Sequence, residues 1–273
     1  MPKVKANNRT LNYDRQGSGD PMVLIPFLTA DHACYAFQVP EYSKHFTCFS
    51  VDLRGTGESD ATKGDYSIED LADDIAAFMQ AANIQKAHIS GLSLGAAVGM
   101  WFAAKYPNKV QSLSLHSPWT KTDGFLKAVI ESWRAMATGL QSVAETTILG
   151  IFPWCFTPEL YNSRSDYIQT LSAFVRSRPA QSLESFLQQS DAVLRHDVSA
   201  QLGRITARTQ ITFGSHDMLT STRFATEMHS KIPNSELHVF EGCAHAALYQ
   251  DVQGFNEKTL DFLKRHSAQR SAA

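Results

Sequence analysis

The chain has 273 residues, of which 43% are hydrophobic and 19% are charged, a composition typical of one globular domain with a large core. The formal net charge is −2 and the lysines and arginines are scattered, which argues against binding to nucleic acid or to an anionic membrane. The N-terminus lacks the apolar core of a signal peptide, and no run approaches the ~18 apolar residues of a membrane span. We therefore expect a cytoplasmic protein.

The cysteines are widely spaced and form no C-x-x-C pair: Cys34, Cys48, Cys155 and Cys243. This spacing argues against a disulfide framework and against a zinc knuckle, so we expect reduced thiols. The chain also lacks a metal-binding histidine cluster of the form H-x-H-x-D-H. The sequence therefore predicts no metal site, and no cofactor is expected.

Strand and helix patterns alternate in the first part of the chain. Residues 10–14 alternate in polarity and, together with residues 22–26, predict an entry hairpin that leads into a buried strand. Another strand is predicted at residues 47–53. Ser67 and Asp70 then resemble a capping box at the start of a helix.

The second part of the chain predicts an interrupted sheet domain. A strand, a helix and a strand are predicted in turn at residues 87–90, 94–106 and 110–116. Strand signals then vanish, and the helical patterns of residues 118–199 predict a cap inserted into a core made of residues 1–117 and 200–273. Strands and helices return at residues 209–213, 223–232, 236–240 and 252–265. This alternation predicts an α/β fold with a mostly parallel central sheet flanked by helices.

The pentapeptide Gly91-Leu92-Ser93-Leu94-Gly95 joins a predicted strand to a predicted helix. On such a turn, a G-x-S-x-G motif holds its serine in a strained backbone with the hydroxyl exposed, and the glycines let strand and helix pass closely. Ser93 is therefore the candidate nucleophile. A serine hydroxyl is a weak nucleophile at neutral pH, so it needs a base within hydrogen-bond reach.

An aspartate and a histidine follow Ser93 at the positions that such chemistry requires. Asp217 comes after a predicted strand, and His245 lies in a small-residue loop between the last predicted strand and helix. His245 would take the serine proton and return it to the leaving group, and Asp217 would orient the imidazole and stabilise its charged form.

Other aspartates and histidines are weaker candidates because of where they lie in the predicted elements. Asp123 follows a strand, whereas Asp191 and Asp197 lie near the end of the predicted cap. His238 lies within a predicted strand, and His216 is adjacent to the candidate aspartate. Asp217 is preferred because the carboxyl ends of parallel strands are where such sheets build their sites.

The chain order of serine, aspartate and histidine resembles that of α/β-hydrolase-fold enzymes of the small esterase and lactonase type, and the resemblance covers nearly the whole chain. Residues 52–59, D-L-R-G-T-G-E-S, resemble the D-x-R-G-x-G-x-S loop of that family. We interpret this loop as structural, with a local ion pair between Asp52 and Arg54 and glycines at positive-φ turns.

The resemblance also implies an oxyanion hole made of two backbone N–H groups. One is that of Leu94, and by position the second is that of Leu28, with Phe27 the next candidate; Pro26 has no N–H and cannot contribute. Relatives usually carry His-Gly in this loop, where this chain has Ile25-Pro26-Phe27-Leu28. Aromatic residues of the predicted cap favour an apolar substrate, and Phe27, Trp119 and Trp154 are predicted to line its cavity.

The sequence thus predicts a metal-independent serine hydrolase that cleaves a small-molecule carboxylic ester or lactone through an acyl-enzyme intermediate. Within the resemblance, enol-lactonases and N-acyl homoserine lactone hydrolases of this fold are similar. Two alternatives stay open: a carbon–carbon bond hydrolase that uses the same three residues, and a slow-turnover ligand receptor of the same fold.

Overall fold

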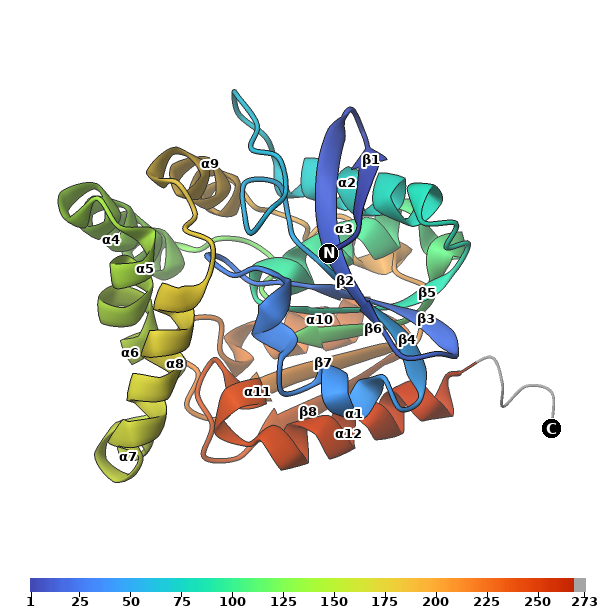
Figure 1. The fold of residues 1–273 in the computed structure, drawn as a ribbon. Coiled ribbons are helices and arrows are strands. Elements are labelled where there is room, and N and C mark those ends of the chain that lie inside the picture. Colours follow the sequence, from blue (N-terminus) through green and yellow to red (C-terminus); the bar gives the residue numbers. More distant parts are fainter. Residues whose placement is uncertain (268–273) are drawn as a thin grey trace.

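The computed structural model describes residues 1–267, and in this range the strands form one eight-stranded sheet (Figure 1). The strand order is β1-β2-β4-β3-β5-β6-β7-β8; β1 and β2 pair antiparallel with each other, β2 pairs antiparallel with β4, and the remaining pairs are parallel. The strands are β1 (Lys3–Ala6), β2 (Arg9–Gln16), β3 (Asp20–Ile25), β4 (Phe46–Val51), β5 (Ala87–Leu92), β6 (Val110–His116), β7 (Thr209–Gly214) and β8 (Ser235–Phe240).

Alternation along the buried strands divides the core into two layers, one on each face of the sheet. In β3, Val23 and Ile25 pack in the layer that contains residues of α2, α3 and α10, whereas Met22 and Leu24 pack in the layer that contains residues of α1 and α12. Burial on both faces explains why residues 22–25 of β3 are apolar throughout. The helices are α1 (Val39–Tyr42), α2 (Ile68–Ala81), α3 (Leu94–Lys105), α10 (Ala225–Lys231), α11 (Ala247–Gln250) and α12 (Val252–Arg265).

The entry hairpin differs from the predicted one. β1 and β2 form the hairpin, through a turn in which Asn7 and Asn8 have φ values of 51° and 60°. Asparagine tolerates this left-handed region, which a tight hairpin turn requires. β2 then pairs with β4 and not with β3, so the prediction that residues 10–14 and 22–26 pair as a hairpin is wrong.

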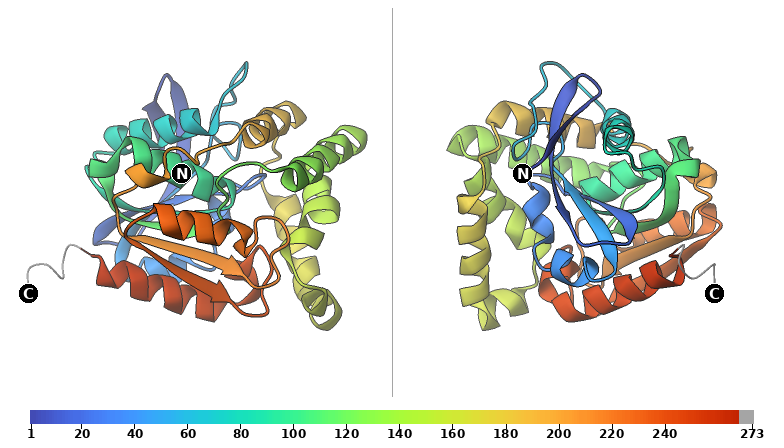
Figure 2. Two further views of the ribbon diagram at one scale, coloured as in Figure 1. Left: turned by 180° about the vertical axis from the view of Figure 1, so that it is seen from behind. Right: turned by 45° about the vertical axis from the view of Figure 1, so that its right-hand side comes forward.

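Helices α4 to α9 lie between β6 and β7 in the chain and form a separate layer beside the sheet (Figure 2). An ion pair of 2.8 Å between Arg178, at the end of α8, and Asp31, in the loop after β3, ties this layer to the sheet domain. Among residues 1–267, none of the helices combines the length and the apolar character needed to cross a bilayer. The helices of the layer are α4 (Gly124–Leu140), α5 (Val143–Thr146), α6 (Phe152–Cys155), α7 (Pro158–Ser163), α8 (Ser165–Ser177) and α9 (Leu183–Leu194).

Candidate active site

Ser93 occupies the sharp turn between β5 and α3. Its backbone angles are φ 53° and ψ −117°, a conformation that a non-glycine residue adopts only under strain. The flanking glycines make the turn possible: a Cβ on Gly91 would lie 2.2 Å from the carbonyl carbon of Gly95, and one on Gly95 would lie 2.1 Å from the carbonyl oxygen of Ile25. The G-x-S-x-G pattern therefore serves close packing of β5, α3 and β3 at this point.

Asp217 and His245 come together at the carboxyl ends of β7 and β8. Their side chains are buried, and His245 Nδ1 donates a hydrogen bond of 2.9 Å to Asp217 Oδ2. Burial opposes ionisation of Asp217, but the electrostatic interaction with the neighbouring His245 ring and hydrogen bonds from His245 and Thr220 outweigh it and lower the carboxyl pKa to about 2. An ionised carboxylate only accepts, so the His245 proton sits on Nδ1 and Nε2 is left free to act as a base.

Two hydroxyl side chains that sequence reasoning missed hold this pair in place. Thr220 Oγ1 lies 3.0 Å from Asp217 Oδ2, 3.0 Å from the carbonyl oxygen of Ser117 and 3.3 Å from His245 Nδ1. Ser117 Oγ donates to the carbonyl oxygen of His245 at 2.9 Å. The only hint in the sequence was a threonine three residues after the aspartate. Only the fold shows that this threonine contacts Ser117, directly after β6, and His245.

The backbone N–H groups predicted for an oxyanion hole lie beside Ser93. Leu94 is the first residue of α3, where N–H groups have no partner within the helix, and both Leu28 and Leu94 line the cavity that contains Ser93. Neither N–H donates a hydrogen bond to another residue in the range 1–267. The Ser93 N–H is already used, because it donates to the carbonyl oxygen of His116 at 2.9 Å.

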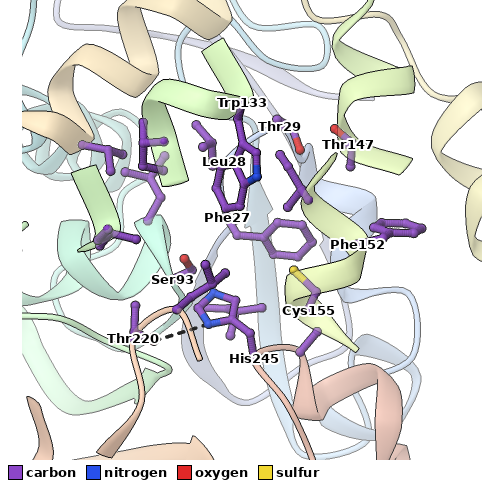
Figure 3. A pocket seen from close by; sticks show the side chains of 18 of the residues that line it. Phe27, Leu28, Thr29, Ser93, Trp133, Thr147, Phe152, Cys155, Thr220 and His245 are labelled. Carbon is purple, nitrogen blue, oxygen red and sulfur yellow. Dashed lines mark hydrogen bonds between the residues drawn. The ribbon is translucent and has the colours of Figure 1, made fainter. Parts of the chain in front are cut away.

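Ser93 and His245 face one cavity between the sheet domain and the α4–α9 layer (Figure 3). The cavity has about 710 Å³ of empty space and a mostly apolar wall, and Phe27 and Trp119 are among its lining residues. Trp154 does not line it and instead packs edge-on against Phe125. The reason is helical spacing: Phe152 and Cys155 of α6 point into the cavity, which turns Trp154 away.

Comparisons with known proteins identify the family to which this fold belongs. Residues 20–252 match the model of the α/β-hydrolase fold family. The chain belongs to this family.

Individual relatives of this α/β hydrolase are distant but similar along their whole length. A protein of Azorhizobium caulinodans with the provisional name carbamate hydrolase RutD is 26% identical over 267 residues, which cover 96% of this chain and 98% of the relative. The enol-lactonase of Burkholderia xenovorans LB400 superposes with a TM-score of 0.85 at 22% identity, covering 96% and 100% of the two chains. Est816, described as an N-acyl homoserine lactone degrading enzyme, gives 0.81 at 22% identity and the same coverage.

The alternative acidic residues have other partners in this α/β hydrolase. Asp123 caps α4 and pairs with Arg223 at 2.9 Å, Asp191 pairs with Arg134 at 3.0 Å, and Asp197 pairs with Lys121 at 2.8 Å. The three carboxylates are therefore paired with basic residues and not with His245. Of the alternative histidines, His238 packs against Phe240 within β8, and His216 lies beside Ser215.

The D-x-R-G loop is a structural element, but its ion pairs differ from the predicted one. Asp52 accepts from His32 Nδ1 at 2.7 Å and from Asn12 Nδ2 at 2.7 Å, whereas Arg54 pairs with Asp74 of α2 at 2.6 Å. The predicted pair between Asp52 and Arg54 is therefore wrong. Residues 31, 32 and 52 bring potential metal-ligand atoms within 4.8 Å of one another, but Arg178 and Asn12 already engage both carboxylates.

Three buried histidines should make this α/β hydrolase sensitive to acid. Burial lowers the pKa of His88 and His196 to about 4 and that of His116 to about 3. In the unfolded chain these rings become protonated near pH 6.5. Between about pH 6.5 and pH 4 the unfolded chain therefore binds more protons than the folded chain. The free energy of unfolding should therefore fall by roughly 1.4 kcal/mol per ring and pH unit in this window.

Urea unfolding at a series of pH values measures this slope. Replacing His88, whose Nδ1 contacts Ser112 Oγ at 2.7 Å, by glutamine should reduce the slope by about one third. A glutamine at the exposed His229 is the matched control. A stability that stays constant from pH 7 to pH 4.5 would contradict the assignment of neutral, buried rings.

Proposed function

We propose that this α/β hydrolase cleaves carboxylic esters or lactones with an apolar acyl part. The observation that carries the proposal is the hydrogen-bonded Asp217–His245 pair, which shares a mostly apolar cavity with a serine held in a strained strand-to-helix turn. Ser93 would attack the carbonyl while His245 Nε2 takes its proton, and Asp217 would stabilise the imidazolium that forms. Figure 3 shows the second ring nitrogen of His245 on the side that faces Ser93.

Stabilisation of the tetrahedral oxyanion would come from the backbone N–H groups of Leu94 and Leu28. Both groups lack a partner within residues 1–267, which fits donors reserved for a bound ligand. His245 would then protonate the leaving alkoxide, and water activated by the same ring would hydrolyse the acyl-enzyme. For a lactone, the leaving alcohol stays tethered, so water must compete with ring closure.

We further propose that residues 118–199 act as a cap subdomain. The α4–α9 segment contributes Trp133, Ile151 and Phe152 to the wall of the cavity that contains Ser93. A cap of this kind excludes bulk water from the reacting carbonyl. The apolar wall favours an uncharged acyl group over a charged one.

A carbamate is the second candidate substrate, because a relative similar along its whole length is named for that activity. Attack on its carbonyl would use the same three side chains. The apolar cavity favours an ester or lactone with a hydrocarbon acyl chain over a small, polar carbamate.

The test is multiple-turnover hydrolysis of p-nitrophenyl esters of graded chain length, γ- and δ-lactones, N-acyl homoserine lactones and carbamate esters. We expect turnover of at least one ester or lactone class. A fluorophosphonate should also label one residue per chain, and peptide mass spectrometry should locate the label on Ser93. Faster turnover of carbamates would favour the second candidate. An inert panel would overturn the proposal and favour the two alternatives, a carbon–carbon bond hydrolase and a slow-turnover ligand receptor. An unlabelled Ser93 would in addition show that Ser93 is not a reactive nucleophile.

A further inference from the structure

A second cavity lies directly beside the one that contains Ser93. It has about 750 Å³ of empty space and extends under α5 and α8 toward the loop after β3. The two cavities share part of their walls, and Figure 3 shows several of these shared residues above His245. The shared residues are Phe27, Thr29, Thr147, Phe152, Phe156 and Tyr249.

Among the three hydroxyl groups of this shared wall, that of Thr29 differs from the others. Thr147 Oγ1 donates to the carbonyl oxygen of Val143 at 2.9 Å, and the Tyr249 hydroxyl donates to that of Cys34 at 2.6 Å. Thr29 Oγ1 is buried and has no hydrogen-bond partner within residues 1–267. Since a buried polar atom without a partner is costly, its presence between two cavities points to a ligand that completes it.

The backbone of Thr29 supports the same conclusion. Its φ is 70°, in the left-handed region that a β-branched residue adopts only with strain. Glycine or asparagine would fit this turn with less strain, so the turn alone does not require threonine. Strain and an unsatisfied hydroxyl at one residue, directly after the proposed oxyanion residue Leu28, are typical of a functional position.

The far end of the second cavity offers no free charge. Asp31 and Arg178 both line it, and they neutralise each other through contacts of 2.8 and 2.9 Å. The other Asp31 oxygen accepts from the backbone N–H of Ala33 at 3.0 Å. The remaining wall is mainly hydrocarbon, with Leu171 and Val175 of α8 among its residues, although Gln181 also lines it and its Oε1 has no hydrogen-bond partner within residues 1–267. An uncharged, apolar group is therefore the occupant that fits.

We propose that the substrate spans both cavities and that Thr29 Oγ1 hydrogen-bonds a polar substituent on its acyl chain. The carbonyl would sit at Ser93, the substituent at the boundary, and the apolar end of the chain in the second cavity. This inference rests on the proposed hydrolysis at Ser93 and narrows its substrate class to acyl chains that carry a hydroxyl, keto or amide group.

The experiment uses methyl octanoate and its derivatives with one hydroxyl at the second, third, fourth or fifth carbon. For the unmodified protein, one position should raise kcat/KM about tenfold over the plain ester. Thr29→Val keeps the shape and the branching but removes the hydroxyl, so this preference should disappear while plain octanoate is still cleaved. Thr29→Ser should retain the preference. A preference that survives in Thr29→Val, or no preferred position, would overturn the inference.

Occupation of the second cavity is tested separately. Ala144 lines only this cavity, and Ala144→Phe should lower kcat/KM for octanoate relative to acetate at least tenfold, with acetate itself as the control for folding. An unchanged ratio would place the acyl chain elsewhere.

If no ester is turned over at all, the proposed hydrolysis is wrong, but the role of Thr29 in binding can still be tested. Calorimetric binding of the same derivatives to the unmodified protein and to Thr29→Val should then show the same positional preference, lost in the valine variant. Equal binding to both proteins would reject the role of Thr29.

Discussion

Replacing Ser93 by alanine should lower kcat by a factor on the order of 10⁶ while leaving the fold intact. The loss follows because only the hydroxyl can form the acyl-enzyme, whereas the hydrogen bond between Asp217 and His245 does not involve Ser93. Alanine has the same Cβ as serine and no further side-chain atoms, so the substitution adds no steric crowding to the strained turn. The measurement is steady-state hydrolysis of the best ester or lactone in the panel, with the thermal midpoint as a check on folding.

Ser163→Ala is the matched control for this substitution. Ser163 lies on α7, and its hydroxyl donates to the carbonyl oxygen of Glu159 at 2.6 Å, outside both cavities. The control should keep full activity. Activity of Ser93→Ala within tenfold of the unmodified protein would show that another group, or water alone, attacks the substrate.

Asp217→Asn should lower kcat by roughly 10⁴-fold, and the hydrogen bonds around Asp217 give a specific reason. The backbone N–H groups of Leu219 and Thr220 both donate to Oδ1, at 2.9 and 3.1 Å. The asparagine oxygen must therefore take that place, which leaves the NH₂ group facing His245 Nδ1. An NH₂ donor forces the His245 proton onto Nε2, where it prevents the ring from accepting the proton of Ser93.

Asp197→Asn serves as the control, because that carboxylate forms an exposed ion pair with Lys121, a contact worth little to stability. kcat should change little in this variant, and KM should be unchanged in both. If Asp217→Asn lost activity only through misfolding, its thermal midpoint would fall and its substrate binding would weaken in parallel. An Asp217→Asn protein with near-normal kcat would instead remove Asp217 from the proposed triad.

The sequence predicted the elements around Ser93 well because they depend on local patterns. The apolar run, the glycines of the turn and the helical spacing behind it lie within one continuous stretch, and the structure has β5 and α3 there, over Ala87–Leu92 and Leu94–Lys105. The predicted strand at residues 110–116 and helix at residues 252–265 also coincide with β6 and α12. The family and the fold class followed from these elements and from the chain order of three residues.

Features that depend on distant contacts were not predictable. Asp52 and Arg54 are two residues apart, yet their partners His32 and Asp74 come from other segments, so local spacing gave the wrong ion pair. Thr29 and Thr220 look like ordinary loop residues, and their roles depend on a cavity and a buried network that no short stretch encodes. Trp154 was misplaced because the sequence does not show which face of a short helix meets the substrate.

The long helical segment between β6 and β7 also affects how the sheet forms during folding. Leu113 pairs with Thr209, so the edge of β6 stays open until the whole α4–α9 segment has been synthesised. Contacts this far apart in sequence form slowly, and an open, apolar strand edge is a template for aggregation. Chains truncated before β7 should therefore be not only inactive, since they lack Asp217 and His245, but also prone to associate with one another.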